Sequence, residues 1–404
     1  MIVAHASNFG EVKMEIRKLT EEDFIQSLKL SMYAFQYRVP KDEIASGMEK
    51  LKDQKVLGIW EQNSLAAKLH IIPLSVHMGG EEWKMGGIAG VATYPESRRG
   101  GYVKSLIMES LKQMRAEEQI VSLLAPFDFP FYRKFGWEIL CENKKVIIEK
   151  EQLKFLNKQP GFLKRYSKET HNDDIERVYQ QHSNSFQSML VRDTKWWLEH
   201  VYNEDSTAAV YYNQSNEAIG YILFNLKDRK MKVQEMVALK HEARIGLWNF
   251  ICQHDSMIDK VAINLSIHDP FPYFLPQPKV KMEISPYFMA RIVDVESVLR
   301  RFPFLKETEG LFLHVDDVYA SWNNGSFLIG KGKVKAFKEK EGSRCTNPPR
   351  KGIQLSINAL SAILFGYKRP NDLYEMGYLQ GAKQEVDKFE MMIPNMKSSF
   401  YDFF

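Results

Sequence analysis

One stretch constrains the fold of this chain more than any other, GGIAGVATYPESRRGGYVKSLI at residues 86–107. An apolar run ends at Pro95, a basic loop with two glycines follows, and apolar residues then recur at helical spacing. The apolar face of that helix consists of Val103, Leu106, Ile107, Leu111 and Met114. The stretch therefore predicts a strand, a tight loop and a helix, which is typical of folds that combine strands and helices.

The order of elements around this stretch recurs further along the chain. Residues 14–150 predict strand, helix, several strands, helix, strand, helix and strand. A weaker copy follows at residues 207–266, and its loop lacks the paired glycines and the arginines. The pattern of predicted strands and helices changes again near residue 285. Since 404 residues exceed what one hydrophobic core normally supports, we predict three domains at 1–150, 151–285 and 286–404.

Composition excludes several classes of protein. The net charge of +4 is spread without a long basic block, which argues against nucleic-acid binding. Cys141, Cys252 and Cys345 are isolated, so we expect neither a structural metal site nor disulfides. The N-terminus lacks the features of a signal peptide, and no apolar run approaches the roughly 18–20 residues that span a bilayer. We therefore expect a cytoplasmic protein without a metal and without a membrane partner.

The basic loop has the chemistry of an anion site. Amide groups at a helix N-terminus lack intrahelical partners and favour negative charge, and Gly100 and Gly101 would let a diphosphate approach the main chain. Arg98, Arg99 and Lys104 add cationic side chains. Neither a GxxxxGK[ST] nor a GxGxxG pattern is present. The alternative is a basic strand-to-helix turn that binds nothing.

Two motifs resemble those of the GCN5-related N-acetyltransferases (the GNAT superfamily). RRGGYV at 98–103 resembles their R/Q-x-x-G-x-G/A loop, with Val103 in place of the final small residue, and FPFYRKFGW at 129–137 resembles their F-Y-x-x-x-G-F segment. The resemblance implies acetyl-CoA as cosubstrate. Its pantetheine arm would lie along one strand, its pyrophosphate on the loop amides, and its acetyl end beside the next strand. The residues implied are Val91, Ala92 and Thr93 for the arm, Arg98, Arg99, Gly100, Gly101, Tyr102, Val103 and Lys104 for the loop, and Phe127 and Asp128 for the acetyl end.

The whole chain is similar to the Eis (enhanced intracellular survival) family of acetyltransferases, and VRDTKWW at 191–197 resembles the R-x-x-x-W-W segment of that family. The resemblance implies an α+β fold in which tandem GNAT-like mixed-sheet domains, the second degenerate, precede a sterol-carrier-protein-like α/β domain. It implies an N-acetyltransferase that acts on a primary amine of an aminoglycoside, a polyamine or a lysine, and a homohexamer. The alternative function is a carrier that binds an apolar ligand or lipid without acetyl transfer.

The resemblance also assigns the proton transfers that such a reaction needs. Tyr132 would protonate the departing sulfur, although a tyrosine here could equally belong to the core. The α-carboxylate of Phe404, at the end of the aromatic tail SSFYDFF, would act as general base, with Asp402 as a second candidate. Aromatic surroundings would raise the pKa of that carboxylate from its reference value of about 3.3–3.7. The alternative is a tail that only packs into its own domain.

Other candidate residues carry weaker signals. His70 and His77 stand on one strand-like run, and we expect both to be structural or on the surface. The acceptor pocket is expected around residues 31–47. There Tyr33, Phe35 and Tyr37 are equally compatible with a core and with a pocket wall.

Overall fold

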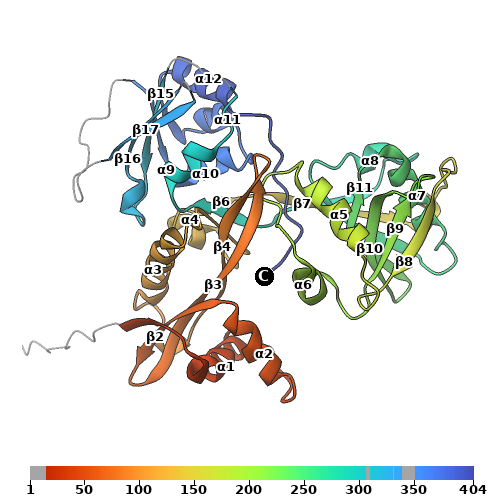
Figure 1. The fold of residues 1–404 in the computed structure, drawn as a ribbon, viewed down its shortest axis with the longest axis horizontal. Helices are drawn as coiled ribbons and strands as arrows, with labels where there is room; N and C mark the ends of the chain where they lie inside the picture. Colours follow the sequence, from red (N-terminus) through yellow and green to blue (C-terminus); the bar gives the residue numbers. More distant parts are fainter. Residues whose placement is uncertain (1–14, 306–309, 331, 339–350) are drawn as a thin grey trace, which may run out of the picture. The chain divides into compact units, whose positions relative to one another are not determined.

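A computed structural model describes residues 15–305, 310–330, 332–338 and 351–404 (Figure 1). Cys345 lies outside these ranges, and the other two cysteines are buried and free. The chain divides into two compact units. Unit 1 comprises Met1–Pro73 and Gly87–Met114, and unit 2 comprises Leu74–Gly86 and Arg115–Phe404. Among the described residues, no helix has the length and apolarity that crossing a membrane requires.

Unit 1 is an antiparallel sheet with helices on its faces. Its strands pair in the order β1-β2-β3-β4, and the far ends of β3 and β4 belong to unit 2. These strands are β1 (Glu15–Lys18), β2 (Lys55–Glu61), β3 (Ser64–Met78) and β4 (Glu81–Thr93). The helices are η1 (Glu21–Asp23), α1 (Phe24–Ala34), α2 (Ile44–Lys52), η2 (Pro95–Ser97) and α3 (Tyr102–Ala116).

The N-terminal helices form where the sequence signals them. The Thr20 amide donates to the Asp23 carboxylate at 2.9 Å, and Arg17 pairs with the same carboxylate at 2.7 Å. This arrangement satisfies a backbone donor that the start of a helix otherwise leaves open. The apolar face of α1 then packs on the sheet, with Phe24 and Leu28 in a core that includes Val56 of β2.

In unit 2 the first sheet continues in the order β4-β5-β14-β6. Its added elements are β5 (Val121–Leu124), α4 (Phe129–Lys134), β6 (Glu138–Ile139) and β14 (Met289–Ile292). Strand β14 pairs antiparallel with both β5 and β6, although about 150 residues of chain separate it from them. The strand that completes this sheet therefore comes from far along the chain.

The second sheet has the order β13-β7-β12-β11-β10-β9-β8. Its strands are β7 (Glu142–Glu149), β8 (Phe162–Tyr166), β9 (Thr207–Tyr212), β10 (Ala218–Lys227), β11 (Lys230–Ala238), β12 (Lys260–Ser266) and β13 (Lys281–Pro286). Its helices are η3 (Lys150–Gln152), α5 (Asp173–Ser183), α6 (Thr194–Trp196), η4 (Trp197–Val201), α7 (His241–Cys252) and α8 (Phe271–Phe274).

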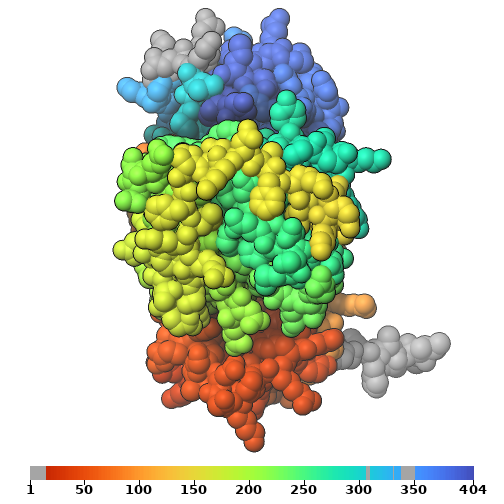
Figure 2. Space-filling model, turned by 90° about the vertical axis from the view of Figure 1, so that its right-hand side faces the viewer, coloured from red at the N-terminus to blue at the C-terminus, as the bar shows by residue number. Residues whose placement is uncertain are grey.

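Helices α5 and α7 cover opposite faces of the second sheet. Alternate residues of β9 belong to different cores, with Ala208 and Val210 on the α5 side and Ala209 and Tyr211 on the α7 side. This period of two is what a strand buried on both faces requires. The yellow and green atoms of this part form a continuous surface in Figure 2.

The third sheet has the order β17-β16-β15-β18-β19. Its strands are β15 (Leu311–Asp316), β16 (Gly325–Gly330), β17 (Lys333–Lys338), β18 (Ile353–Ser356) and β19 (Leu379–Gly381). Its helices are α9 (Val295–Arg301), η5 (Ser321–Asn323), α10 (Ile357–Leu364), α11 (Pro370–Glu375) and α12 (Lys383–Met392). One core joins this sheet to the unit 2 part of the first sheet, because Leu313 and Leu360 pack in the same cluster as Trp83 and Ala290.

Candidate active site

The basic loop of unit 1 joins β4 to α3 in a tight path. Arg98, Arg99, Gly100 and Gly101 are exposed, and α3 begins at Tyr102 as the sequence predicts. Arg99 (φ 67°) and Gly101 (φ 83°) are in the left-handed region of backbone conformation, which is cheap for glycine and costly for arginine. The loop thus carries two cationic side chains and a bare backbone to the N-terminus of a fifteen-residue helix.

One carboxylate holds both ends of this loop. Ser97 donates to Glu61 at 2.6 Å, and the Tyr102 hydroxyl donates to the other oxygen of the same carboxylate. The hydrogen bond from Ser97, followed by that from Tyr102, lowers the pKa of Glu61. A surface cleft of about 820 Å³ that includes Gln26, Lys29, Tyr94 and Glu96 also borders Glu61. The sequence analysis missed Glu61, since its contacts join β2 to a loop more than thirty residues away.

Strand β4 bends immediately before the residues expected to hold pantetheine. Gly90 has φ 56° in mid-strand, and a Cβ atom there would lie 2.7 Å from the His70 ring. Beyond this bend Val91 is half-buried, while Ala92 and Thr93 are buried. The Thr93 hydroxyl has no hydrogen-bond partner among the described residues, which leaves it available to a ligand.

A buried lysine lies close to this bend, and the sequence analysis did not identify it. Lys68 of β3 is fully buried, and its ammonium nitrogen lies 2.8 Å from the Ser27 hydroxyl, 2.5 Å from that of Ser31 and 3.0 Å from His70 Nε2. The other ring nitrogen of His70 lies 2.7 Å from Gln54 Oε1. Burial lowers the pKa of Lys68 to about 7 and that of His70 well below its usual value. His70 is therefore a structural residue, and His77 is also buried, so neither is on the surface.

The exposed aromatic residues of unit 1 are not part of its core. Tyr33, Phe35 and Tyr37 are 57%, 52% and 43% exposed. Of the two interpretations that the sequence left open for these three side chains, their placement in a core is wrong. A pocket wall stays a prediction.

In unit 2, Tyr132 lies on α4 inside a cluster of aromatic rings. It is 3% exposed, and its ring contacts Phe127 at 5.4 Å and Phe131 at 5.1 Å between ring centroids. Phe127 is 72% exposed, so the cluster opens to solvent on that side. Asp128 caps the helix by accepting from the Phe131 amide at 2.6 Å. Burial raises the pKa of the Tyr132 phenol, so this group holds its proton at neutral pH.

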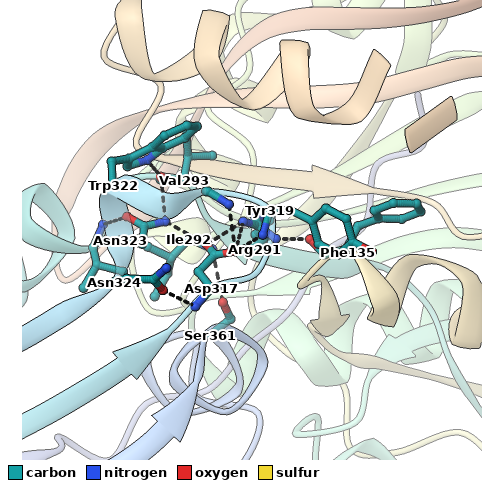
Figure 3. Close-up of polar contacts among 12 residues, drawn as sticks. Phe135, Arg291, Ile292, Val293, Asp317, Tyr319, Trp322, Asn323, Asn324 and Ser361 are labelled. Carbon is teal, nitrogen blue, oxygen red and sulfur yellow. Dashed lines mark hydrogen bonds and ion pairs between the residues drawn. The ribbon is translucent and has the colours of Figure 1, made fainter. Parts of the chain in front are cut away.

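The other end of α4 is fixed from β14 and from the third domain (Figure 3). Arg291 donates to the Phe135 carbonyl and forms a bidentate ion pair with Asp317 at 2.6 and 2.8 Å. Asn358 of α10 donates to the carbonyls of Arg133 and Trp137 at 3.0 Å each. These contacts occupy carbonyls that the end of a helix leaves unsatisfied, and they fix the segment that carries Tyr132.

The aromatic tail ends beside β6. The Phe404 ring lies 5.2 Å from the Phe288 ring and 6.1 Å from that of Phe400. Phe288 accepts a hydrogen bond from the Leu140 amide, just after β6, and the Trp137 amide, just before β6, donates to the Tyr132 carbonyl. Tyr132 and the tail therefore lie at opposite ends of the same short strand.

Asp402 does not have the environment of a base. Its carboxylate accepts from Arg192 Nε at 2.9 Å and from Trp196 Nε1 at 2.8 Å, and it is almost completely buried. Its main-chain carbonyl accepts from the Tyr287 hydroxyl at 2.8 Å. These hydrogen bonds to Asp402 thus fix the position of the tail. Among the described residues, no group of three or more His, Cys, Asp or Glu side chains could hold a metal ion.

Comparisons with known proteins identify the class of protein. Residues 15–140 match a family model described as an acetyltransferase (GNAT) domain, and residues 188–292 match a second model with the same description. Residues 295–401 match a sterol carrier protein domain. No curated protein matches the sequence significantly.

Solved structures share the fold over nearly the whole chain. A conserved protein of unknown function from Enterococcus faecalis, described as a probable N-acyltransferase, has a TM-score of 0.89 and 24% identity, covering 97% of this chain and 100% of its own. A GCN5-related N-acetyltransferase from Anabaena variabilis has a TM-score of 0.84 and 24% identity, with the same coverage. Eis1 from Mycobacterium abscessus has a TM-score of 0.80 and 18% identity, covering 96% of this chain and all of its own.

Two GNAT domains followed by a sterol carrier domain define an acetyltransferase, and they confirm the predicted α+β fold class. The chain therefore contains two GNAT acetyltransferase domains and a sterol carrier domain, and it shares its fold with Eis1. The roles of the individual site residues stay predictions.

Proposed function

We propose that this acetyltransferase moves the acetyl group of acetyl-CoA to a primary amine by direct attack. The observation that carries the proposal is the continuous segment formed by β4, the exposed basic loop and α3. This segment joins a strand with a left-handed residue at Gly90 to a helix N-terminus, with no side chain at Gly100 or Gly101. Acetyl-CoA would supply an activated thioester and a diphosphate that this segment is suited to bind.

The residues of unit 1 fit the cosubstrate in two respects. The loop offers amides at a helix N-terminus together with the exposed Arg98 and Arg99. The buried Thr93 hydroxyl lacks a partner among the described residues and would gain one from the pantetheine arm. Val91, Ala92 and Lys104 complete the predicted binding surface, and Phe127 and Asp128 of unit 2 would border the acetyl end.

Tyr132 would serve as the general acid. As the new N–C bond forms and the C–S bond breaks, its phenol would give a proton to the departing sulfur. A raised pKa keeps the phenol protonated until a thiolate with a reference pKa near 8.5 develops.

The Phe404 carboxylate would serve as the general base. It would take the proton that the acceptor ammonium must lose before the lone pair of its nitrogen can attack the thioester carbonyl. The Phe288 and Phe400 rings contact the Phe404 ring and so hold the last residue in place. The nitrogen would lose its first proton to the tail before it attacks. Tyr132 would protonate the departing sulfur, and its phenolate would then take the second proton that the nitrogen loses as the amide forms, which restores the phenol.

The acceptor is a primary amine of an aminoglycoside, a polyamine or a lysine. The exposed Tyr33, Phe35 and Tyr37 are available to contact a cationic acceptor through their ring faces. The family resemblance further predicts a homohexamer, and the sequence features described above predict a cytoplasmic location.

The experiment that tests this function measures thiol release. Acetyl-CoA is incubated with the purified protein and a panel of amines, and the expected result is thiol formation that depends on the amine. Calorimetry with coenzyme A checks the loop separately. Absence of both signals would contradict the proposal.

A lipid carrier remains the second candidate, because a cavity of about 480 Å³ lies among α9, β17 and α12 in the sterol carrier domain. Apolar side chains such as Leu299, Phe302 and Val334 line it together with Arg300 and Lys333. A fluorescent fatty acid that binds this domain, together with a lack of thiol release, would favour the carrier.

A further inference from the structure

Two strands of the second domain separate where a GNAT domain would receive its cofactor. Strand β11 precedes α7 as β4 precedes α3, so β11 and β12 correspond to β4 and β5. Their parallel pairing runs only from Lys230↔Lys260 to Val233↔Ile263, although β11 continues to Ala238. Glu235 lies in this diverging part and is buried.

A buried arginine reaches the diverging strand. Arg192 donates to both oxygens of Glu235 at 2.5 and 3.1 Å, and its guanidinium lies 3.9 Å from the Tyr179 ring centroid and 4.5 Å from that of Trp197. The Tyr221 hydroxyl also donates to Glu235 at 2.6 Å. The side chain of Arg192 has no exposed surface, so protein atoms surround it completely.

The third partner of Arg192 is the tail of the chain. Its Nε donates to the Asp402 carboxylate, two residues before the terminus. The carboxylates of Asp402 and Glu235 therefore share one guanidinium in a buried site. Burial raises the pKa of Asp402, and the negative charge of Glu235 acts in the same direction, whereas Arg192 acts against both. Without the guanidinium the two carboxylates would repel each other, and the tail would be the part free to leave.

Further contacts align the tail on the same segment of the second domain. Ser398 forms a parallel bridge with Gln187, and the Ser399 amide donates to the Gln187 carbonyl at 3.2 Å. The Tyr401 ring stacks on His182 with ring centroids 6.0 Å apart. Residues 182–196 thus contact Ser398, Ser399, Tyr401 and Asp402 of the tail.

We propose that the second domain, which lacks the glycine loop, is the receptor of the C-terminal tail, and that Arg192 is a positioning residue for the Phe404 carboxylate. The inference rests on the proposed function in that it assigns the carboxylate a catalytic role. Arg192 itself touches neither the reacting groups nor the cosubstrate loop. It acts through Asp402, and the diverging part of β11, which would border pantetheine in a GNAT domain, here binds Arg192 and through it the tail.

Two variants of the full-length protein test this proposal. Arg192→Met keeps an unbranched apolar stem but removes the guanidinium, which leaves Glu235 and Asp402 without a counter-charge. Asp402→Asn keeps the Arg192–Glu235 pair and weakens only its link to the tail. Hydrogen exchange of the amides at 399–404, measured by mass spectrometry without substrate, reports whether the tail is bound.

We expect exchange of the tail amides to accelerate at least tenfold in Arg192→Met and by a smaller factor in Asp402→Asn. We expect kcat to fall by at least tenfold in Arg192→Met with the KM for acetyl-CoA unchanged, since the cosubstrate loop is intact. The matched control is Arg291→Met, which breaks an equally buried bidentate ion pair, with Asp317, that involves no tail residue. It should lower the melting temperature and leave exchange of the tail at the wild-type rate.

The outcomes separate this inference from the proposed function. If the wild-type protein shows no acetyl transfer but exchange of the tail amides accelerates in Arg192→Met, the enzymatic function is refuted. The proposal that Arg192 holds the tail is then supported. If the tail amides exchange at the wild-type rate in both Arg192→Met and Asp402→Asn, the proposal that Arg192 holds the tail is overturned. A freed tail with unchanged kcat would overturn the positioning role. If Arg192→Met does not fold, Asp402→Asn decides the question.

Discussion

Lys68 shows how far burial alone can change a side chain. Its ammonium has the Ser27 and Ser31 hydroxyls and the His70 imidazole as partners, and none of these carries a negative charge that would compensate the loss of solvation of the charged form. Burial accordingly lowers its pKa to about 7, against a reference of about 10.4 in an unfolded chain. Between these values the unfolded chain binds one more proton than the folded chain.

This difference predicts that Lys68 makes the protein more stable as the pH rises. In the window from about pH 7 to 10 the free energy of unfolding should increase by up to about 1.4 kcal/mol per pH unit from this group, and the gain should be lost as pH falls toward 7. Urea unfolding of wild type and Lys68→Met at pH 6.5, 8 and 9.5 measures it. The slope of wild type should exceed that of the variant, and equal slopes would show that Lys68 is charged in the folded protein.

Tyr132 carries the second prediction at this scale. Tyr132→Phe removes the proposed acid and leaves the aromatic cluster intact, so kcat should fall by roughly 10²–10⁴-fold while coenzyme A binding persists. Tyr166→Phe, on the second sheet, is the control and should keep wild-type kcat. Steady-state kinetics measures kcat of both variants, and calorimetry measures their binding of coenzyme A. Full activity of Tyr132→Phe would show that the phenol is not the general acid.

At the scale of elements, α4 is held at both ends by side chains from elsewhere. Asp128 caps its start, and Arg291 and Asn358 occupy the carbonyls at its end. Gly136 makes the second arrangement possible, because it has φ 93° and a Cβ atom there would lie 1.9 Å from Arg291 Nη1. A helix of six residues cannot be rigid alone, so these contacts give it its place.

Gly136→Ala should therefore destabilise the protein more than a glycine substitution of similar backbone geometry. Gly377 has φ 80° with open space around a Cβ, so Gly377→Ala should cost about 1–2 kcal/mol of backbone strain. Gly136→Ala should cost about 1–3 kcal/mol more, because Arg291 must move. Chemical unfolding of the two variants measures the difference, and equal losses would contradict the close contact.

At the scale of the molecule, distant parts of the chain complete each other's sheets. Strand β14 lies between β5 and β6 in the first sheet, and β7 lies between β13 and β12 in the second. The tail binds the second domain and ends beside β6. The terminus therefore depends on three domains for its position.

This dependence predicts that the free terminus is essential. Four residues appended after Phe404, such as Gly-Ser-Gly-Ser, move the α-carboxylate away and should abolish turnover while acetyl-CoA still binds. Gly-Ser-Gly-Ser placed before Met1 is the control. Kinetics and calorimetry on both proteins give the answer, and normal kcat with the C-terminal extension would eliminate the terminal carboxylate as base.

The sequence alone determined the local elements and the class of protein. Pro95, Gly100 and Gly101 set the end of β4 and the start of α3, and Thr20 with Asp23 set the first helix, because each acts on its own backbone or within a few residues. The motifs around Arg98 and Tyr132 identified the acetyltransferase class in the same way. Only the tertiary structure decided that Glu61 holds the loop, that Lys68 is buried, that Arg192 joins Glu235 to Asp402, and that β14 enters the first sheet. Those contacts join residues tens to hundreds of positions apart, and spacing along a chain carries no information about which distant side chains burial will bring together.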